Sequence, residues 1–366
     1  MLVRIANEPR DYAWGSDSAI PAFLGTPSTG GPQAELWLGA HPSCPALVDG
    51  RGLDAVLDDA GLEQPRILLK VLAAARPLSL QAHPDAAQAA AGFAREDAAG
   101  VPRDAPTRTY RDPHAKPELV VAITPFEALS GFRPVEASLR VLDALAAAAP
   151  EVEALATRVR RSLREAVDWL LSDAREVRGV LAAVERAAAS LPARFDAERD
   201  TVRRVATAAT GDPAVAIAML LHRVSLAPGE ALYLGAGNLH AYLEGLGIEL
   251  MGPSDNVVRG GMTPKHVDRA ELLRILDLTP LADPRLPAVE LDGAVAWRPP
   301  APFELRRVHG AHRIEDGRQL LVLARADTEV SVDGERLRLR RGESAYADTT
   351  RDAVVEGDEA WVALAG

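Results

Sequence analysis

The chain has 366 residues, of which 48% are hydrophobic and 25% are charged, and its formal net charge is −11. This length predicts about two to three domains and leaves ample chain for a large core. The acidic balance argues against a nucleic-acid-binding protein but permits an anionic small substrate, because a few cations can be focused into one cleft.

The first residues, MLVRIANEPRDYAWGS, lack the apolar segment and the small-residue cleavage site of a secretory signal. No uncharged apolar run of about 18 residues occurs, which argues against a membrane span. The chain has a single cysteine, Cys44, so it can form neither an intramolecular disulfide nor a cysteine-rich zinc site. We therefore expect a cytoplasmic protein in which any metal is bound by histidine, carboxylate or amide groups.

Up to about residue 133, short apolar runs such as LVRIA, AELWLGA, RILLKVL and ELVVAIT alternate with proline and glycine turns. This pattern predicts strands with one or two short helices between them, for example over DAAQAAAGFARED. From about residue 134 to 212 the chain is rich in Ala, Leu, Arg and Glu, and one helical face is expected to carry Leu163, Val167, Leu170 and Leu171. We expect a block of several antiparallel helices here, which we interpret as a structural insert or a lid.

The segment AVAIAMLLHRV after Pro213 predicts one more helix, with His222 packed on it. Strand patterns then return and continue through the rest of the chain, as short alternating runs with Gly and Asp turns that suggest a small sandwich or barrel. The stretches PGEALYLGAG at 228–237 and RGESAYADTT at 341–350 are loosely alike, as though one β unit recurs. The second copy carries no histidine, so we expect a second β-barrel without a metal site.

A candidate metal site begins in SLQAHPD, where strand alternation directs Ser79, Gln81 and His83 to one face. Glu118 in HAKPELVVAIT and His240 in GAGNLHAYLEG lie in similar strand-like segments. Two histidine nitrogens, a carboxylate and an amide oxygen form a four-ligand set for Zn²⁺ or another divalent first-row metal. The spacing alone leaves a second interpretation open, in which these are polar residues of the core or the surface.

A second polar cluster lies in GIELMGPSDNVVRGGMTPKHVD. Its glycines allow the backbone to approach a ligand closely, and loops on a rigid β scaffold are where binding groups concentrate. The alternative is a solvated polar loop. The residues that carry the binding hypothesis are Glu249, Asp255, Asn256, Arg259 and Lys265.

Several stretches in chain order closely resemble motifs of the type I mannose-6-phosphate isomerases (phosphomannose isomerases): YAWGS, AELWLGAHPS, LLKVL, PLSLQAHPD, HAKPEL, LSGFRP, GNLHAYLEG and SDNVVRGGMTPKHVD. The resemblance covers residues 9–133 and 226–268. It implies a mainly β protein with an all-helical insert, built from cupin (jelly-roll) β-barrels, one catalytic and one C-terminal and degenerate. The domains expected from it are residues 1–133 with 214–295 for the catalytic cupin, 134–213 for the helical insert, and 296–366 for the metal-free C-terminal barrel.

By the same resemblance, the chain binds one Zn²⁺ through Gln81, His83, Glu118 and His240. The implied catalytic residues are Arg259, Glu249 and Lys116, and the implied substrate-binding residues are Ser79, Lys70, Tyr242, Asp255 and Lys265. The chain departs from the family pattern at two points. It has His114 and Ala115 where Asn-His is usual before Lys-Pro-Glu, which puts the proton-transfer role of that family histidine in doubt, and it has Gly260 where alanine is usual.

The implied reaction interconverts mannose 6-phosphate and fructose 6-phosphate through a cis-enediol. Zinc would act as Lewis acid, and the permanently charged Arg259 would stabilise the enediolate. Glu249 or Lys116 is expected to be the base, with His114 as a third alternative. The groups expected to hold the phosphate are Ser79, Lys70 and Lys265.

The expected partner is therefore a small sugar phosphate, with no nucleic acid and no membrane, and the expected state is a monomer. Two other functions remain open. A different metal-dependent cupin, such as an iron dioxygenase, is disfavoured by the Gln81 ligand and by the Arg259–Lys265 cluster. A non-catalytic cupin that binds sugar phosphates would be expected to have a damaged pocket.

Overall fold

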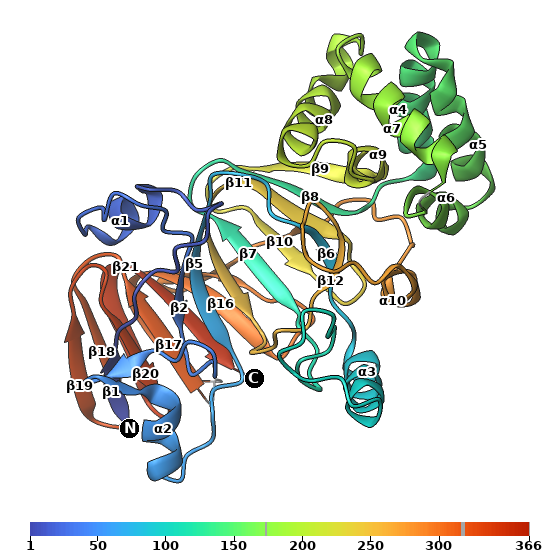
Figure 1. Ribbon diagram of the computed structural model, residues 1–366. Coiled ribbons are helices and arrows are strands. Elements are labelled where there is room, and N and C mark those ends of the chain that lie inside the picture. The colour runs from blue at the N-terminus through green and yellow to red at the C-terminus, as the bar shows by residue number, and fades with distance from the viewer. Residues whose placement is uncertain (173, 316–318, 366) are drawn as a thin grey trace.

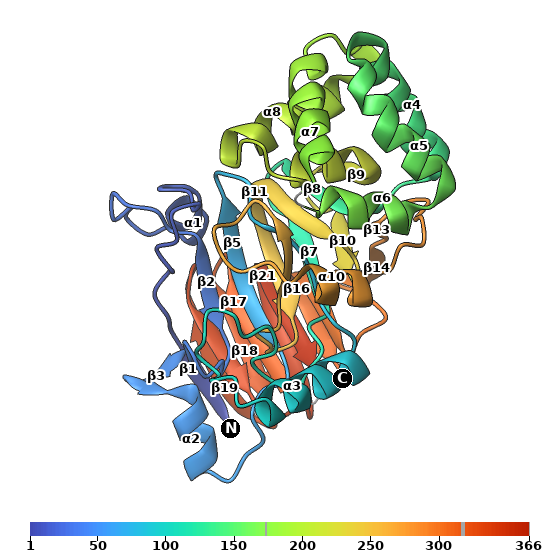
Figure 2. The ribbon, with the colours of Figure 1, turned by 45° about the vertical axis from the view of Figure 1, so that its right-hand side comes forward.

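The computed structural model describes residues 1–172, 174–315 and 319–365 of the chain (Figure 1). It is a mainly β structure with helices, in which two large sheets lie against each other and most helices gather at one end (Figures 1 and 2). None of the helices in the described ranges is long and apolar enough to cross a membrane.

Sheet I contains strands that precede the helical region together with strands that follow it. Its central strands are apolar and almost entirely buried, as expected for strands covered on both faces. Within the described residues its ten strands are β2 (Glu35–Leu38), β5 (Leu68–Ala74), β6 (Leu80–Ala82), β7 (Glu118–Ala122), β8 (Phe126–Phe132), β9 (Leu221–Leu226), β10 (Ala231–Leu234), β11 (His240–Met251), β12 (Val258–Gly261) and β13 (Arg285–Leu286).

Sheet II contains the C-terminal strands, and the first strand of the chain joins it by pairing antiparallel with β20. Because β1 belongs to sheet II while β2 belongs to sheet I, the two sheets are interleaved in sequence, and the boundary predicted at 295/296 falls inside β15 of sheet II. In the described part of the chain its strands are β1 (Leu2–Ile5), β14 (Val289–Leu291), β15 (Ala294–Trp297), β16 (Phe303–Ile314), β17 (Gln319–Ala324), β18 (Thr328–Val332), β19 (Glu335–Leu339), β20 (Ser344–Ala347) and β21 (Ala353–Ala365), and a separate hairpin pairs β3 (Leu47–Val48) with β4 (Arg51–Gly52).

One apolar core joins the two sheets. Leu69 and Ile248 of sheet I belong to the same buried cluster as Leu305, Trp297 and Trp361 of sheet II. The rings of Trp297 and Trp361 stack with their centroids 5.7 Å apart. Both tryptophans belong to sheet II, and since aromatic side chains bury more apolar area than most others, the pair is a large part of the apolar surface that sheet II contributes to the shared core.

The helical region runs from Val135 to Leu220, and the described residues between these limits form no strand. Its apolar faces pack into one core cluster that also includes residues of β6, β8, β11 and β12, so the helices are packed onto one end of sheet I. The helices of the region are α4 (Val135–Ala148), α5 (Glu153–Arg161), α6 (Leu163–Leu170), α7 (Arg175–Ala188), α8 (Asp196–Ala208) and α9 (Ala214–Ile217), with short 3-10 turns η1 (Pro150–Val152), η2 (Ala193–Phe195) and η3 (Ala218–Leu220).

The helix predicted over AVAIAMLLHRV is shorter than expected. Helical structure ends at Leu220, and β9 begins at the next residue. His222 therefore lies on a strand, where its Nε2 is 2.9 Å from the carbonyl oxygen of Leu281. The physical reason is the pairing of β9 with β8, which outweighs the local helical propensity of an Ala- and Leu-rich segment.

Four helices lie outside this region: α1 (Ala19–Leu24), α2 (Leu53–Asp59), α3 (Ala86–Ala98) and α10 (Arg269–Ile275). Helix α3 begins directly after SLQAHPD because Asp85 and Gln88 form a capping box. The Asp85 carboxylate accepts from the Gln88 backbone N–H at 2.7 Å, and Gln88 Oε1 accepts from the Asp85 backbone N–H at 3.0 Å. This cap ends the short strand β6 and directs the chain away from the sheet.

Strand β11 bends at Gly245 and thereby serves two parts of sheet I. Its first residues pair with β6 and β8, and its residues after the bend pair with β5 and β7. Gly245 has a φ of 131°, and a Cβ placed there would lie 2.6 Å from the Phe126 ring, so only glycine fits the bend. The bend brings His240 next to Gln81 and Glu249 next to Lys70.

Candidate metal centre and substrate cavity

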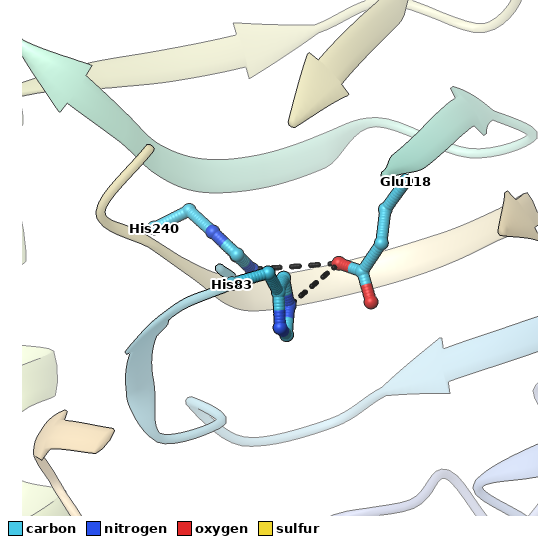
Figure 3. A group of neighbouring side chains, drawn as sticks. All are labelled: His83, Glu118 and His240. Carbon is cyan, nitrogen blue, oxygen red and sulfur yellow. Dashed lines mark ion pairs between the residues drawn. The ribbon is translucent and has the colours of Figure 1, made fainter. Parts of the chain in front are cut away.

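Two histidines and a glutamate converge where three strands of sheet I meet (Figure 3). His83 follows β6, Glu118 begins β7 and His240 begins β11. Glu118 Oε2 lies 3.4 Å from His83 Nε2 and 3.5 Å from His240 Nε2. All three residues are at most 2% exposed, so the group is shielded from solvent.

Backbone carbonyls fix the protonation of both imidazole rings. His83 Nδ1 is 2.7 Å from the Asn256 carbonyl oxygen, and His240 Nδ1 is 3.0 Å from that of Asn238. A carbonyl only accepts, so each Nδ1 carries a hydrogen, and each ring turns its Nε2 toward the Glu118 carboxylate.

Lone pairs and a carboxylate that face one another repel unless a cation lies between them. His83 Nε2 and Glu118 Oε2 are buried and have no hydrogen-bond partner. Leaving buried polar atoms unpaired lowers the stability of the fold. Histidine Nε2 ligands held through Nδ1 by backbone carbonyls are typical of zinc sites. The donor set therefore fits a divalent metal ion.

Gln81 lies at the edge of this group. Its amide nitrogen is 3.4 Å from His240 Nε2, and its Oε1 accepts from the Ser79 hydroxyl at 3.4 Å. Rotation of the amide by half a turn would direct Oε1 toward the histidines and make Gln81 the fourth ligand. The register also places Arg259 of β12 opposite Gln81, so His240, Gln81 and Arg259 form one row across three strands.

Burial and charge shift the pKa values of His83 and Glu118 in the direction that a metal requires. Burial lowers the pKa of His83 to about 4, so the ring stays neutral. Burial alone would raise the pKa of Glu118, but Lys116 and His83 outweigh it and hold the pKa well below its usual range. The Lys116 ammonium lies 2.9 Å from Glu118 Oε1. Neutral imidazoles and an ionised carboxylate are the forms that bind a metal.

A second buried network lies beside the first. The register aligns Trp37, Lys70 and Glu249 across β2, β5 and β11. The Lys70 ammonium is 3.3 Å from Glu249 Oε2 and 3.7 Å from Glu35 Oε1, and it lies 4.7 Å from the centre of the Trp37 ring. Burial would lower the pKa of Lys70, but the two carboxylates raise it.

One ammonium lies between two buried carboxyl groups in this network. Burial raises the pKa of Glu249, Lys70 opposes that rise, and Glu118 and Glu35 add to it. The Tyr242 hydroxyl donates to Glu249 Oε1 at 2.8 Å, and burial followed by the charge of Glu249 raises the pKa of Tyr242. The surroundings of Glu249 therefore raise its proton affinity above that of an exposed carboxylate.

A cavity of about 410 Å³ opens next to both networks. The residues predicted for the site divide into two sets. Seven of them line the cavity: Lys70, Ser79, Gln81, Lys116, Asp255, Arg259 and Lys265. The other five, His83, Glu118, His240, Tyr242 and Glu249, are buried and are not part of that lining.

Cations gather at one side of the cavity. Burial lowers the pKa of Arg259, and Arg111 adds to this shift. Burial, Arg259 and Arg111 lower the pKa of Lys265. Among the described residues, no carboxylate raises the pKa of Arg259 or of Lys265. The positive charge on this side of the cavity therefore favours an anion. His114 is exposed and does not line the cavity, which leaves the hypothesis that it is the base without support.

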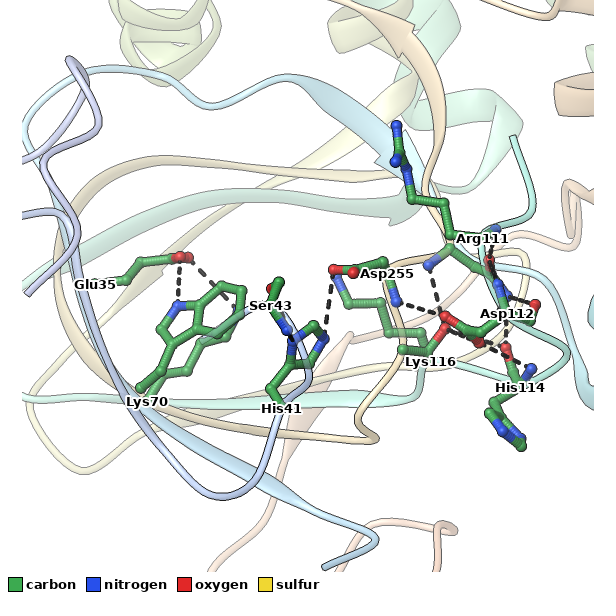
Figure 4. Close-up of polar contacts among 12 residues, drawn as sticks. Glu35, His41, Ser43, Lys70, Arg111, Asp112, His114, Lys116 and Asp255 are labelled. Carbon is green, nitrogen blue, oxygen red and sulfur yellow. Dashed lines mark hydrogen bonds and ion pairs between the residues drawn. The ribbon is translucent and has the colours of Figure 1, made fainter. Parts of the chain in front are cut away.

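Several cavity residues were not singled out from the sequence. Glu35 accepts from the Trp37 indole N–H at 2.8 Å, and His41 Nε2 is 3.5 Å from Asp255 Oδ1 (Figure 4). Tyr12 and Trp14 also line the cavity, and their rings stack with centroids 5.8 Å apart. The segment AELWLGAH contains Glu35, Trp37 and His41. The carboxylate of Glu35 inside an apolar strand is the feature of the sequence that could have pointed to them.

Asn256 joins the two loops that flank the metal group. It is fully buried, and its Oδ1 accepts from the backbone N–H of Arg111 at 2.8 Å. Its amide donates to the carbonyl oxygens of Asp112 at 2.7 Å and His114 at 2.9 Å. These contacts connect the loop that leads to Lys116 (Figure 4) with the backbone carbonyl that orients His83.

Replacing Asn256 with alanine is expected to lower the free energy of unfolding by at least about 3 kcal/mol, since each buried polar group left unpaired costs about 1–3 kcal/mol. Metal affinity should fall about 10- to 100-fold, because the carbonyl that orients His83 is released. Urea unfolding and a chelator competition would measure both effects. Asn256→Asp is the matched variant: it cannot donate to the two carbonyls, so behaviour like that of the unmodified protein would contradict this assignment.

Acid should destabilise the metal-free protein in a window set by His83. The unfolded ring takes up a proton near pH 6.5, whereas the buried ring resists until about pH 4. The free energy of unfolding is therefore expected to fall by roughly 3 kcal/mol as the pH drops through this window. Glu118, whose pKa is lowered, stabilises the fold above its ordinary pKa and adds to the loss at lower pH. Urea unfolding at several pH values would measure how steeply the free energy of unfolding changes with pH. His309→Gln is the control, because His309 is exposed, and it should leave this slope unchanged. An unchanged slope in His83→Gln would contradict the assignment to His83.

The mainly β fold and a buried two-histidine, one-carboxylate group beside a cation-lined cavity define a candidate metal-dependent enzyme. The family model for the phosphomannose isomerase type I catalytic domain matches residues 2–135. The mannose-6-phosphate isomerase of Shigella flexneri is 36% identical over 294 residues, which cover 74% of each chain. That of Salmonella typhimurium is 33% identical over 379 residues, which cover 94% of each chain.

Solved structures agree over the whole chain. The structure of mannose 6-phosphate isomerase from Salmonella typhimurium bound to its substrate, fructose 6-phosphate, and to zinc has a TM-score of 0.88 and 30% sequence identity, and covers 100% of this chain and 99% of its own. A zinc-bound mannose 6-phosphate isomerase structure has the same TM-score, identity and coverage. The chain belongs to the type I mannose-6-phosphate isomerase family.

Proposed function

We propose that the chain is a zinc-dependent aldose–ketose isomerase that interconverts mannose 6-phosphate and fructose 6-phosphate through a cis-enediol. The observation that carries this proposal is the buried group of His83, Glu118 and His240, which includes two ligand atoms without a hydrogen-bond partner and lies beside a cavity with cations in its lining. The identity of 36% to a mannose-6-phosphate isomerase supports the same reaction.

Zinc would be held by His83, Glu118, His240 and Gln81. When bound, it supplies a Lewis acid that polarises a sugar oxygen. The chain's own part is to present the two histidine Nε2 atoms, which the carbonyls of Asn256 and Asn238 orient through Nδ1. The same burial keeps the site in a low-dielectric environment, where charges interact strongly.

Arg259 is proposed to stabilise the negative charge that develops on the enediolate oxygens. It lies opposite Gln81 in the strand register and lines the cavity, so it approaches both the ligand group and the substrate space. A fixed cation with several N–H donors lowers a barrier most where water is excluded. The groups proposed to bind the sugar phosphate are Ser79, Lys70, Tyr242, Asp255 and Lys265.

Glu249 and Lys116 are proposed for the proton transfer between the two sugar carbons. Burial gives Glu249 the raised pKa that a carboxylate base needs near neutral pH. Lys116 lines the cavity and contacts Glu118, so it is the better placed of the two to meet substrate. Glu249→Gln and Lys116→Met can be compared by solvent deuterium exchange at the substrate carbon, which the variant of the true base should lose.

We further propose that the sheets are cupin (jelly-roll) units, with the catalytic unit in residues 1–133 and 214–295. The helical insert would be residues 134–213 and the metal-free C-terminal unit residues 296–366, with β1, β14 and all of β15 added to that unit because they pair in the same sheet. The bend of β11, which serves four neighbouring strands, supports a sheet that curls around the site. The single Cys44 is consistent with a cytoplasmic location, and the monomeric state remains a prediction that analytical ultracentrifugation would check.

A coupled assay that follows fructose 6-phosphate formation from mannose 6-phosphate tests the proposal. Activity should disappear on chelation and return with stoichiometric Zn²⁺. Absence of isomerisation by the fully metal-loaded protein would falsify it. Oxygen consumption measured on an iron-loaded sample would indicate a dioxygenase, and sugar-phosphate binding without turnover would indicate a non-catalytic cupin.

A further inference from the structure

The segment that carries the cavity cations contains a turn with unusual backbone geometry. Between Arg259 and Lys265, Gly261 has a φ of 153° and Met262, which is not a glycine, has a φ of 52°. Met262 lines the cavity together with Thr263 and Pro264. A non-glycine residue keeps a positive φ only where its surroundings hold it there.

The group that holds this turn is the carboxylate of Asp212, which comes from the helical region. Asp212 Oδ2 accepts from the Met262 backbone N–H at 2.9 Å, and its Oδ1 accepts from the Ala214 backbone N–H at 2.8 Å, at the start of α9. A Cβ on Gly261 would lie 2.4 Å from Asp212 Oδ1. The carboxylate therefore occupies the space that a side chain at position 261 would need.

The far end of the same segment is also bonded to the helical region. Asp168 of α6 accepts from Arg269 Nε at 3.0 Å at the start of α10. Arg164 of α6 donates to the carbonyl oxygen of Leu273 in α10 at 2.6 Å. Both ribbon views place α6 beside α10 (Figures 1 and 2). The segment between Gly261 and α10 is thus fixed at both ends by helices.

This fixation has a consequence for the cations. Arg259 and Lys265 carry like charges and both line the cavity, and the charge of Arg111 lowers the pKa of each. Two like charges repel each other, so they stay close together only if the backbone between them is held in place. The turn is the connection between them, and Asp212 is the only helical-region carboxylate among the described residues that accepts from its backbone N–H groups.

We propose that Asp212 is a positioning residue for the anionic end of the substrate, and that the helical region sets phosphate affinity through it. By holding Met262, it keeps Lys265 at the place beside the cavity where its ammonium binds the phosphate group, whereas Arg259 is held by the pairing of β12 with β6. The inference rests on the proposed function for the identity of the sugar phosphate, whereas the binding of phosphate itself does not depend on turnover.

The test compares Asp212→Asn and Asp212→Ala with the unmodified zinc-loaded protein. We expect KM for mannose 6-phosphate and the Kd of inorganic phosphate, measured by calorimetry, to rise about 10-fold or more, while kcat changes less than about threefold and zinc stays stoichiometric. Asp283→Asn is the matched control, because Asp283 also accepts a backbone N–H, from Arg285 at 3.0 Å, but lies outside the helical region and the cavity lining. It should leave KM and the phosphate Kd unchanged.

Gly261→Ala gives an independent approach from the other side of the contact. Its new Cβ would displace the Asp212 carboxylate, so it should raise the same two constants, and its effect should not add to that of Asp212→Ala. Unchanged KM and phosphate Kd in a folded Asp212→Asn variant, or full additivity with Gly261→Ala, would overturn the proposal. If the unmodified protein does not isomerise, the proposed function fails, and the phosphate Kd alone still decides the role of Asp212.

Discussion

Replacing Glu118 with glutamine is expected to remove bound zinc and isomerase activity together. Glu118 is buried, and its Oε2 lies within 3.5 Å of both histidine Nε2 atoms. Glutamine keeps the size but removes the charge that compensates a divalent ion. The loss of affinity should exceed about 100-fold, the upper end of what removing a hydrogen-bond partner of a ligand costs.

Zinc per chain by elemental analysis and kcat/KM in the coupled assay would be measured on the same sample. Glu244→Gln is the matched control, since Glu244 lies on the same sheet, is exposed and pairs with Arg204 on the surface. It should keep full zinc and activity. Stoichiometric zinc in Glu118→Gln would show that Glu118 is not a ligand.

Replacing Arg259 with alanine is expected to have a different effect, in which zinc and fold are kept and kcat falls by about 10²- to 10³-fold. Removal of one donor that stabilises transition-state charge typically has this cost. The structure favours a role in turnover because Arg259 lines the cavity and pairs with no described carboxylate, so its charge has no structural partner to lose.

Rapid-mixing kinetics, zinc content and thermal unfolding would be compared for Arg259→Ala and for Arg285→Ala. Arg285 lies on β13 of the same sheet, pairs with Asp283 and is not part of the cavity. Arg259→Lys should recover only part of kcat, because an ammonium lacks the planar fork of a guanidinium. Loss of metal or of the fold in Arg259→Ala would instead assign the residue a structural role.

Much of the fold could be predicted from local patterns of apolar and polar residues. The strands around LLKVL and ELVVAIT and the helices between residues 135 and 208 form where apolar periodicity predicted them. Alternation predicted that Ser79, Gln81 and His83 share one side. In the structure Ser79 and Gln81 line the cavity, and His83, one residue beyond β6, contacts Glu118.

Long-range pairing accounts for what the sequence could not predict. The helical propensity of AVAIAMLLHRV is overridden by pairing of β9 with β8, a strand that precedes the whole helical region. Leu2 pairs with Ala347 of β20, and no local signal in the first strand specifies that partner. Asn256 looked like one polar loop residue among several, and its role is visible only because loop 111–114 folds onto it.

The same limit applies to charges in the site. The pKa of Glu249 depends on Lys70, Glu118 and Glu35, which come from three other strands. The sequence contains these residues but not their distances, and electrostatic interactions depend on distance and burial. For the same reason, the contact between Asp212 and Met262 has no counterpart in any sequence pattern.

The central claim is that Gln81, His83, Glu118 and His240 hold the zinc ion of an isomerase. Anomalous diffraction from crystals of the zinc-loaded protein, recorded on both sides of the zinc absorption edge, tests it most directly. The account predicts one strong peak among these four side chains, at about 2.0–2.2 Å from the histidine nitrogens and the Glu118 carboxylate. A peak at another group of residues, or none in fully active crystals, would contradict it.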